Sequence, residues 1–285
     1  MRKTISLWTL GIAAMLASCS QNEEMLPIPT TDGQTAQVTI SVQAPGAQTR
    51  AAVDQLKRYV CEVYEGATAT GDATRYEQDN GNFAMTLKKN TAYTFLFWAD
   101  QGELPGQTGT YYYDATNLKE VSVSGSTTAD AYFGKIENKT ITGADNAGFD
   151  VTLRHAVAKI VYENTTPFTE DVNKLKVTYE KKHKLDVATG AITEIEGGGT
   201  FATEFTINDK TQAELGVDYM FAPAAEGQLF KITTQLNAEP EKILTNIPLR
   251  LNHVTRIKGA FSNMYDASFT VSKEVEDMSG ENKDF

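Results

Sequence analysis

Short runs in which every second side chain is apolar dominate this sequence. Val38, Ile40 and Val42 alternate with polar residues in the first run, and clusters such as Asp79–Asn82 and Gly197–Gly199 separate later runs. Further runs of this kind cover residues 83–87, 93–99, 121–123, 149–153, 156–162, 175–179, 205–207, 217–221, 230–232, 243–251 and 269–271. A period of two between frequent turns indicates half-buried β-strands. No stretch keeps an apolar face at helical spacing, so the sequence predicts an all-β protein built of sandwiches.

The N-terminus matches a bacterial lipoprotein signal. Arg2 and Lys3 precede the apolar stretch Ile5–Leu16, which is too short to anchor a chain across a bilayer. Leu16-Ala17-Ser18-Cys19 then forms a lipobox. We therefore expect residues 1–18 to be removed as a signal peptide and Cys19 to carry lipid, including palmitate. Several acyl chains on one residue hold a protein durably on the outer membrane.

Residues 19–36 are expected to be a tether between the lipid and the fold. Ser20–Glu24 is polar and acidic, and Pro27 and Pro29 favour a semi-extended spacer. The acidic segment resembles the export signal behind the lipidated cysteine of surface-exposed Bacteroidota lipoproteins. The alternative is a plain polar tether, which any lipoprotein requires.

Charge and cysteine content narrow the partners of the mature chain. Without Arg2 and Lys3 it has 24 basic and 37 acidic residues, a net charge of −13. No basic stripe is present to neutralise phosphates, which argues against a nucleic-acid partner.

Cys61 is the one cysteine besides Cys19, so an internal disulfide between unmodified cysteines is not expected. Its place in an alternating run predicts a small buried hydrophobic residue.

The mature chain is long enough for two domains. The loop Ala144–Gly148 suggests a boundary near residue 150, giving β-sandwiches at 37–150 and 151–285. No proline-rich linker marks this boundary, so we expect two sandwiches packed closely in tandem.

Four strand sequences resemble those of fimbrillin-like lipoproteins of Bacteroides and its relatives. They are Phe95–Asp100 (FLFWAD), Asp130–Gly134 (DAYFG), Leu153–Ile160 (LRHAVAKI) and Asn252–Gly259 (NHVTRIKG). Their order and spacing extend the resemblance over about residues 37 to 273. The resemblance implies two transthyretin-like β-sandwiches and a role in cell-surface fimbriae, as shaft, anchor or accessory tip subunit.

In shaft subunits of this type an arginine-specific protease cuts after the first strand, and a strand of the next subunit fills the freed groove. Such β-augmentation satisfies an otherwise unpaired sheet edge. Here Arg50 and Ala51 follow the first strand in small polar residues that suit an exposed loop. Cleavage between them would release Val38, Ile40 and Val42 with the lipid. The alternative is that Arg50 is a surface arginine.

The tail departs from the family pattern. Residues 272–285 are polar and acidic and lack the longer apolar extension expected of a donor strand. The tail therefore argues against polymerisation through the C-terminus, and the alternatives are an anchor subunit, an accessory subunit or a diverged relative with another surface task.

The sequence offers no recognisable enzyme site. His155, His183 and His253 are the only histidines, and no two have metal-ligand spacing. We expect His155 and His253 to be structural. A paired-carboxylate glycosidase needs two acids about 5 to 10 Å apart, which sequence alone does not place. The prediction is a protein without enzymatic activity, cofactor or metal.

The alternative function is glycan binding by a surface lipoprotein that accompanies an outer-membrane nutrient transporter. Such proteins stack sugars on exposed aromatic rings. Tyr111 and Tyr113, in the run Tyr111–Tyr113, are the candidate platform, whereas Trp98 lies in the most apolar strand and is expected in the core. The favoured function remains adhesion and fimbrial assembly, with other fimbrial subunits or a host or bacterial surface ligand as partners.

Overall fold

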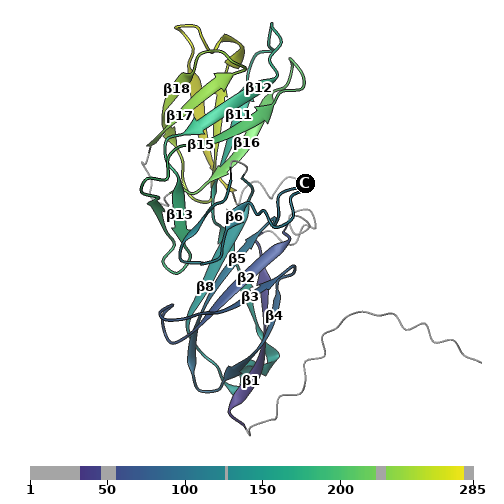
Figure 1. The fold of residues 1–285 in the computed structure, drawn as a ribbon, viewed down its shortest axis with the longest axis vertical. Coiled ribbons are helices and arrows are strands. Elements are labelled where there is room, and N and C mark those ends of the chain that lie inside the picture. Colours follow the sequence, from purple (N-terminus) through teal and green to yellow (C-terminus); the bar gives the residue numbers. More distant parts are fainter. Residues whose placement is uncertain (1–32, 46–55, 126–127, 223–228, 279–285) are drawn as a thin grey trace, which may run out of the picture. The chain divides into compact units, whose positions relative to one another are not determined.

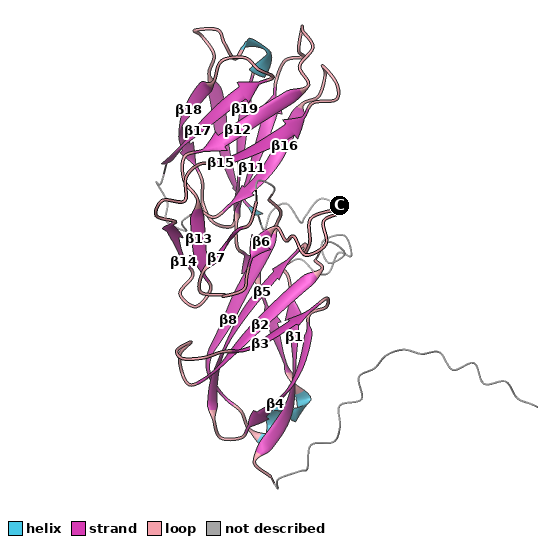
Figure 2. Cartoon of the chain, viewed as in Figure 1, coloured by secondary structure: helices cyan, strands magenta, loops and turns pink. Residues whose placement is uncertain are grey.

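The computed structural model describes residues 33–45, 56–125, 128–222 and 229–278. Strands dominate these residues (Figure 1), and helix is limited there to the 3-10 turns η1 (Gly143–Ala147) and η2 (Phe261–Asn263) (Figure 2). Described residues from Gln34 onward belong to one compact unit. The prediction of an all-β, sandwich-type fold is confirmed.

Two sheets pack face to face as the first sandwich. The smaller has the order β4-β1-β9, formed by β1 (Thr35–Gln43), β4 (Asn82–Lys88) and β9 (Phe149–Thr152). The larger has the order β10-β8-β5-β2-β3, formed by β2 (Arg58–Glu65), β3 (Thr74–Gln78), β5 (Ala92–Asp100), β8 (Ala131–Thr140) and β10 (Arg154–His155). Alternate side chains from both sheets fill one core, as the period of two requires.

Two four-stranded sheets form the second sandwich. One has the order β16-β11-β19-β20, formed by β11 (Ala158–Asn164), β16 (Glu214–Met220), β19 (His253–Gly259) and β20 (Val271–Asp277). The other has the order β15-β12-β17-β18, formed by β12 (Lys174–Tyr179), β15 (Phe201–Thr206), β17 (Leu229–Leu236) and β18 (Lys242–Pro248). A second core lies between them.

A fifth sheet joins the two sandwiches. Its order is β14-β13-β7-β6, with β6 (Tyr113–Asp114) and β7 (Val121–Val123) from the first half of the chain and β13 (His183–Asp186) and β14 (Ala191–Glu194) from the second (Figure 2). A third core combines residues of this sheet with outward-facing residues of the first sandwich and with Phe221 and Leu251. This shared core explains why no flexible linker is needed between the sandwiches.

The third core also explains the unusually apolar run at β5. Phe95 and Phe97 face the first core, whereas Leu96 and Trp98 face the third. A strand covered on both faces is apolar throughout instead of alternating. The expectation that Trp98 is a core residue is confirmed, since its side chain is fully buried.

The passage between the sandwiches lies a few residues beyond the expected boundary at residue 150. β9 pairs in parallel with β1, and β10 pairs with β8, so both strands belong to the first sandwich. Leu153 lies in the first core and Ala158 in the second. The chain therefore crosses over between these two residues.

Candidate functional site

The first strand, β1, lies in the middle of the three-stranded sheet. It is antiparallel to β4 over Thr35–Ser41 and parallel to β9 over Ile40–Gln43. Its inward side chains are almost fully covered, with exposed fractions of 1% for Val38, 0% for Ile40 and 5% for Val42. The predicted displaceable strand is thus a central strand, and its removal would expose the first core along a slot between β4 and β9.

Two glycines border this slot and let neighbouring chain approach the backbone of β1. A Cβ on Gly148 would come closer than 3.0 Å to the carbonyl oxygen of Thr39, and one on Gly81 equally close to that of Val42. The Val42 amide also donates to the Gly81 carbonyl over 2.8 Å. Gly148 has a φ of 79°, which favours glycine for a second reason.

The turn η1 lies against β1 and is fixed by one carboxylate. Asp145 accepts the Thr142 amide over 2.6 Å and pairs with Lys139 over 2.9 Å. Lys139 and these hydrogen bonds lower the pKa of Asp145 to about 2. The turn that leads into Gly148 therefore keeps its ion pair across the physiological range.

The residues predicted for anchoring and maturation lie outside the described residues. Cys19 precedes them, and Arg50 and Ala51 fall between Pro45 and Leu56. Beyond this segment Leu56 is buried in the first core, as Ala44 is before it, and the Lys57 amide donates to the Asp100 carbonyl over 3.0 Å. Both ends of the segment that carries Arg50 are thus fixed to the first sandwich.

The structure corrects the predicted glycan platform. Tyr113 is fully buried, with its ring packed 5.3 Å from that of Trp98 and its hydroxyl donating to the Ala129 carbonyl. Tyr111 is half-buried, and the Arg58 guanidinium lies 4.2 Å from its ring centroid. The two rings therefore do not form an exposed stacking surface.

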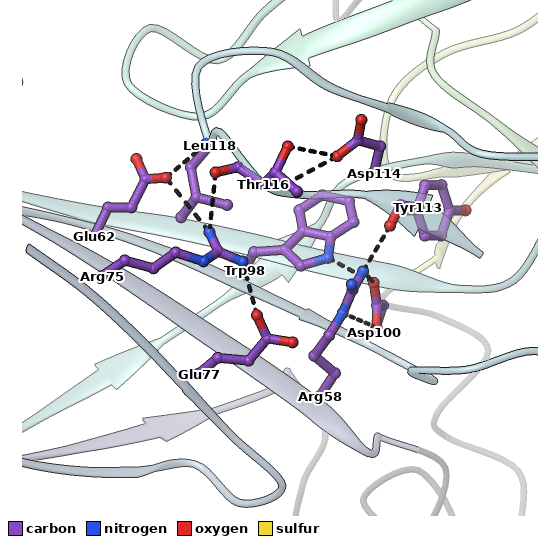
Figure 3. A network of polar contacts seen from close by, with 10 residues as sticks. All are labelled: Arg58, Glu62, Arg75, Glu77, Trp98, Asp100, Tyr113, Asp114, Thr116 and Leu118. Atoms are coloured by element: carbon purple, nitrogen blue, oxygen red, sulfur yellow. Dashed lines mark hydrogen bonds and ion pairs between the residues drawn. The ribbon is translucent and has the colours of Figure 1, made fainter. Parts of the chain in front are cut away.

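A buried ion pair that sequence reasoning missed lies beside these tyrosines (Figure 3). Arg58 at the start of β2 pairs with Asp100 at the end of β5, and it also donates to the Tyr113 carbonyl over 2.8 Å. Trp98 Nε1 donates to Asp100 Oδ2 over 2.7 Å. The signal in the sequence that could have indicated this pair is a charged residue at the end of each of two apolar runs.

The motifs that carry the family resemblance meet at the joint between the sandwiches. His155 Nδ1 lies 3.0 Å from Asp130 Oδ1, and the Tyr132 hydroxyl donates to the same carboxylate over 2.8 Å. The Asn252 amide donates to the Val157 carbonyl over 3.1 Å. His155 is buried and contacts Asp130, which fits the structural role expected for it. His253, expected to be structural too, has Nδ1 2.9 Å from the Leu251 carbonyl.

Asp218 is a second buried carboxylate that the sequence did not reveal. It accepts from the hydroxyls of Thr128 and Tyr179 and from the Tyr219 amide, the last over 2.9 Å. Burial raises its pKa above the usual value, against the opposing effect of these donors. Because Thr128 precedes the strand β8 of the first sandwich, Asp218 links the two sandwiches.

Cys61 and His183 are the remaining groups considered for chemistry. Cys61 is buried, as expected, and burial raises the pKa of its thiol. Burial lowers the pKa of His183. Among the described residues, no three His, Cys, Asp or Glu side chains gather as metal ligands. In the same residues no helix has the length and apolarity to span a membrane.

Sequence comparison decides the family. The profile of a family of unknown function, DUF6562, matches residues 29–276. The chain belongs to DUF6562. No curated protein matches it.

Solved structures share the fold of this DUF6562 protein. A candidate cell adhesion protein of Bacteroides ovatus is 16% identical, with a TM-score of 0.52 over 86% of this chain and 98% of that chain. A second, from Bacteroides uniformis, is 14% identical, with a TM-score of 0.53 over 86% and 99%. The tip fimbrial protein Mfa3 of Porphyromonas gingivalis, with C-terminal truncation, is 12% identical, with a TM-score of 0.50 over 85% and 99%. The expected resemblance to fimbrillin-like proteins is confirmed in the fold.

Proposed function

We propose that this DUF6562 protein is a lipid-anchored, fimbrillin-like surface subunit that acts in adhesion and fimbrial assembly by exchange of its first strand. The observation that carries the proposal is the position of β1, which fills a slot between β4 and β9 with three nearly inaccessible side chains. Removing such a strand exposes apolar surface and unpaired backbone together. An extended strand of a partner satisfies both.

The chain around β1 suits release by a single cut. Arg50 and Ala51 lie between the last residue described near β1, Pro45, and the buried Leu56. Cleavage there would separate β1 and the lipid on Cys19 from the rest of the protein. The Leu56 side chain and the Lys57 backbone would still hold the new terminus on the first sandwich.

Neighbours in the fold support the surface role. The candidate adhesion proteins of Bacteroides and the Porphyromonas tip protein share this two-sandwich architecture. We propose that the partners are other fimbrial subunits or a ligand on a host or bacterial surface. The protein is proposed to act by binding alone, without catalysis.

The proposal is tested by substituting Arg50 in the source bacterium. Arg50→Gln is expected to abolish high-mass species of the protein on a gel run without boiling. Lys57→Gln is the matched control, because it removes a nearby exposed positive charge and no arginine. An unchanged ladder in Arg50→Gln would contradict release after this residue.

A further inference from the structure

We infer that the slot filled by β1 selects its partner strand by size and charge: small residues at both ends, β-branched residues between them, and no charge facing inward. The inference rests on the proposed function and names the kind of strand that another subunit must supply. It follows from the inward side chains of β1, from the backbone track of the slot, and from a comparison with β20.

The inward side chains of β1 and the residue after it form a graded series. Ala36, Val38, Ile40, Val42 and Ala44 are all buried in the first core, whereas Thr35, Gln37, Thr39 and Gln43 are exposed. The largest of the five, Ile40, lies opposite Phe83 of β4, and both are fully buried. A larger residue at either end would overpack the core, and a charged residue anywhere in the series would be buried without a partner.

The backbone positions along the slot impose a second requirement on the occupant, and this requirement does not depend on side chains. Gly81 and Gly148 let the carbonyl oxygens of Val42 and Thr39 approach more closely than a side chain at either glycine would allow. The occupant must therefore be extended at this register, antiparallel to β4 and parallel to β9. A bulged or helical segment would not satisfy both approaches.

The strand β20 of a second copy does not meet these demands. One face of β20 presents Val271, Lys273, Val275 and Asp277, and the other presents Ser272, Glu274 and Glu276. Either register would bury at least one charge in the slot. In its own sheet β20 is an edge strand, and Glu274 pairs with Lys258 over 2.7 Å. The partner strand therefore differs from β20.

A strand-exchange experiment on the full chain tests this selectivity. A site-specific protease sequence replaces residues 46–50, so that cutting does not depend on Arg50. The cut protein is then challenged with labelled peptides: residues 35–44, the same peptide with Ile40→Asp or Thr39→Asp, and residues 269–278. Thr39 and Ile40 are neighbours on opposite faces, so the two substitutions are a matched pair.

The peptide 35–44 and its Thr39→Asp form are expected to bind with affinities within about fivefold of each other. The Ile40→Asp form and the β20 peptide are expected to bind at least about 100-fold more weakly, because each would bury an unpaired charge. Binding of either weak peptide as tightly as the parent would overturn the inference.

A second measurement on the uncut chain separates this inference from the proposed function. A cut protein that takes up no peptide at all would contradict strand exchange, and selectivity is then decided by thermal unfolding of uncut variants. Ile40→Asp is expected to lower the melting temperature by about 10 °C or more, and Thr39→Asp by about 2 °C or less. Gly81→Ala is expected to lower it more than Gly125→Ala, whose added Cβ meets nothing within 4 Å. Equal shifts within either pair would overturn the inference.

Discussion

Arg58 and Asp100 are directly opposed residues of β2 and β5, and their side chains form an ion pair shielded from solvent (Figure 3). Arg58 Nε donates to Asp100 Oδ1 over 3.1 Å, and the Gly102 amide donates to the same oxygen over 2.8 Å. With Trp98 on the other oxygen, the carboxylate is fully satisfied. The pair joins the start of β2 to the end of β5.

Asp100→Ala is expected to lower the free energy of unfolding by about 3 to 5 kcal/mol, because it leaves the Arg58 guanidinium buried and unpaired. Urea denaturation measures this loss. The control is Lys88→Ala, which breaks the exposed pair with Glu65 and is expected to change stability far less, because solvent screens an exposed ion pair. Equal losses in the two variants would contradict the account of the buried pair.

The alternating pattern predicted the strands well because one face of most strands is buried. It identified Val38, Ile40 and Val42 as inward residues, and all three lie in the first core. It could not pair Arg58 with Asp100, since 42 residues separate them and no local pattern records which strands become neighbours. For the same reason, the sequence did not predict the contact between Thr128 and Asp218.

The prediction of a glycan platform at Tyr111 and Tyr113 was wrong for a different reason. A strand rule puts Tyr111 and Tyr113 on one face, but β6 begins only at Tyr113, and Tyr111 forms an isolated bridge with Glu103. Tyr112 and Tyr113 are both buried because the third core lies around them. That core draws on both sandwiches, so no local sequence window could predict it.

Tyr113→Ala is expected to lower the free energy of unfolding by about 3 to 5 kcal/mol, as for other buried aromatic residues. Tyr111→Ala is expected to cost about 1 kcal/mol, since its ring is half-buried and contacts Arg58. Chemical denaturation compares the two, and a larger loss in Tyr111→Ala would contradict the burial described. Binding to a glycan array is expected to be unchanged in Tyr111→Ala.

Asp218 is expected to make stability depend on pH in a defined direction. Its folded-state pKa is raised by burial above the usual 3.8, so the folded protein binds this proton more tightly than the unfolded chain does. The resulting stabilisation is complete below the unfolded pKa and is lost as pH rises through the folded pKa. The stability of the parent minus that of Asp218→Asn is therefore expected to fall as pH rises above the usual pKa of 3.8.

The control for this measurement is Asp209→Asn. Asp209 is exposed, and hydrogen bonds from Thr211 lower its pKa, so its contribution is present above the unfolded pKa and lost as pH falls. The stability of the parent minus that of Asp209→Asn is expected not to fall as pH rises over the same range. A flat or rising difference for Asp218→Asn would contradict the raised pKa.

Cys61 is expected to be unreactive in the folded protein, because burial disfavours the thiolate that attacks thiol reagents. In a Cys19→Ser chain it is the single thiol. Its modification should be slow in native buffer and fast in denaturant. Rapid modification under native conditions would show that β2 opens readily and would contradict the buried position.

The central claim is that β1 is released so that a partner strand takes its place, and the N-terminal residue of the protein on its native cell surface tests it most directly. Mass spectrometry of surface material, paired with a gel run without boiling, reads the terminus and the assembly state together. The account predicts a start at Ala51 in high-mass species. A lipidated Cys19 start in a single low-mass band would contradict it.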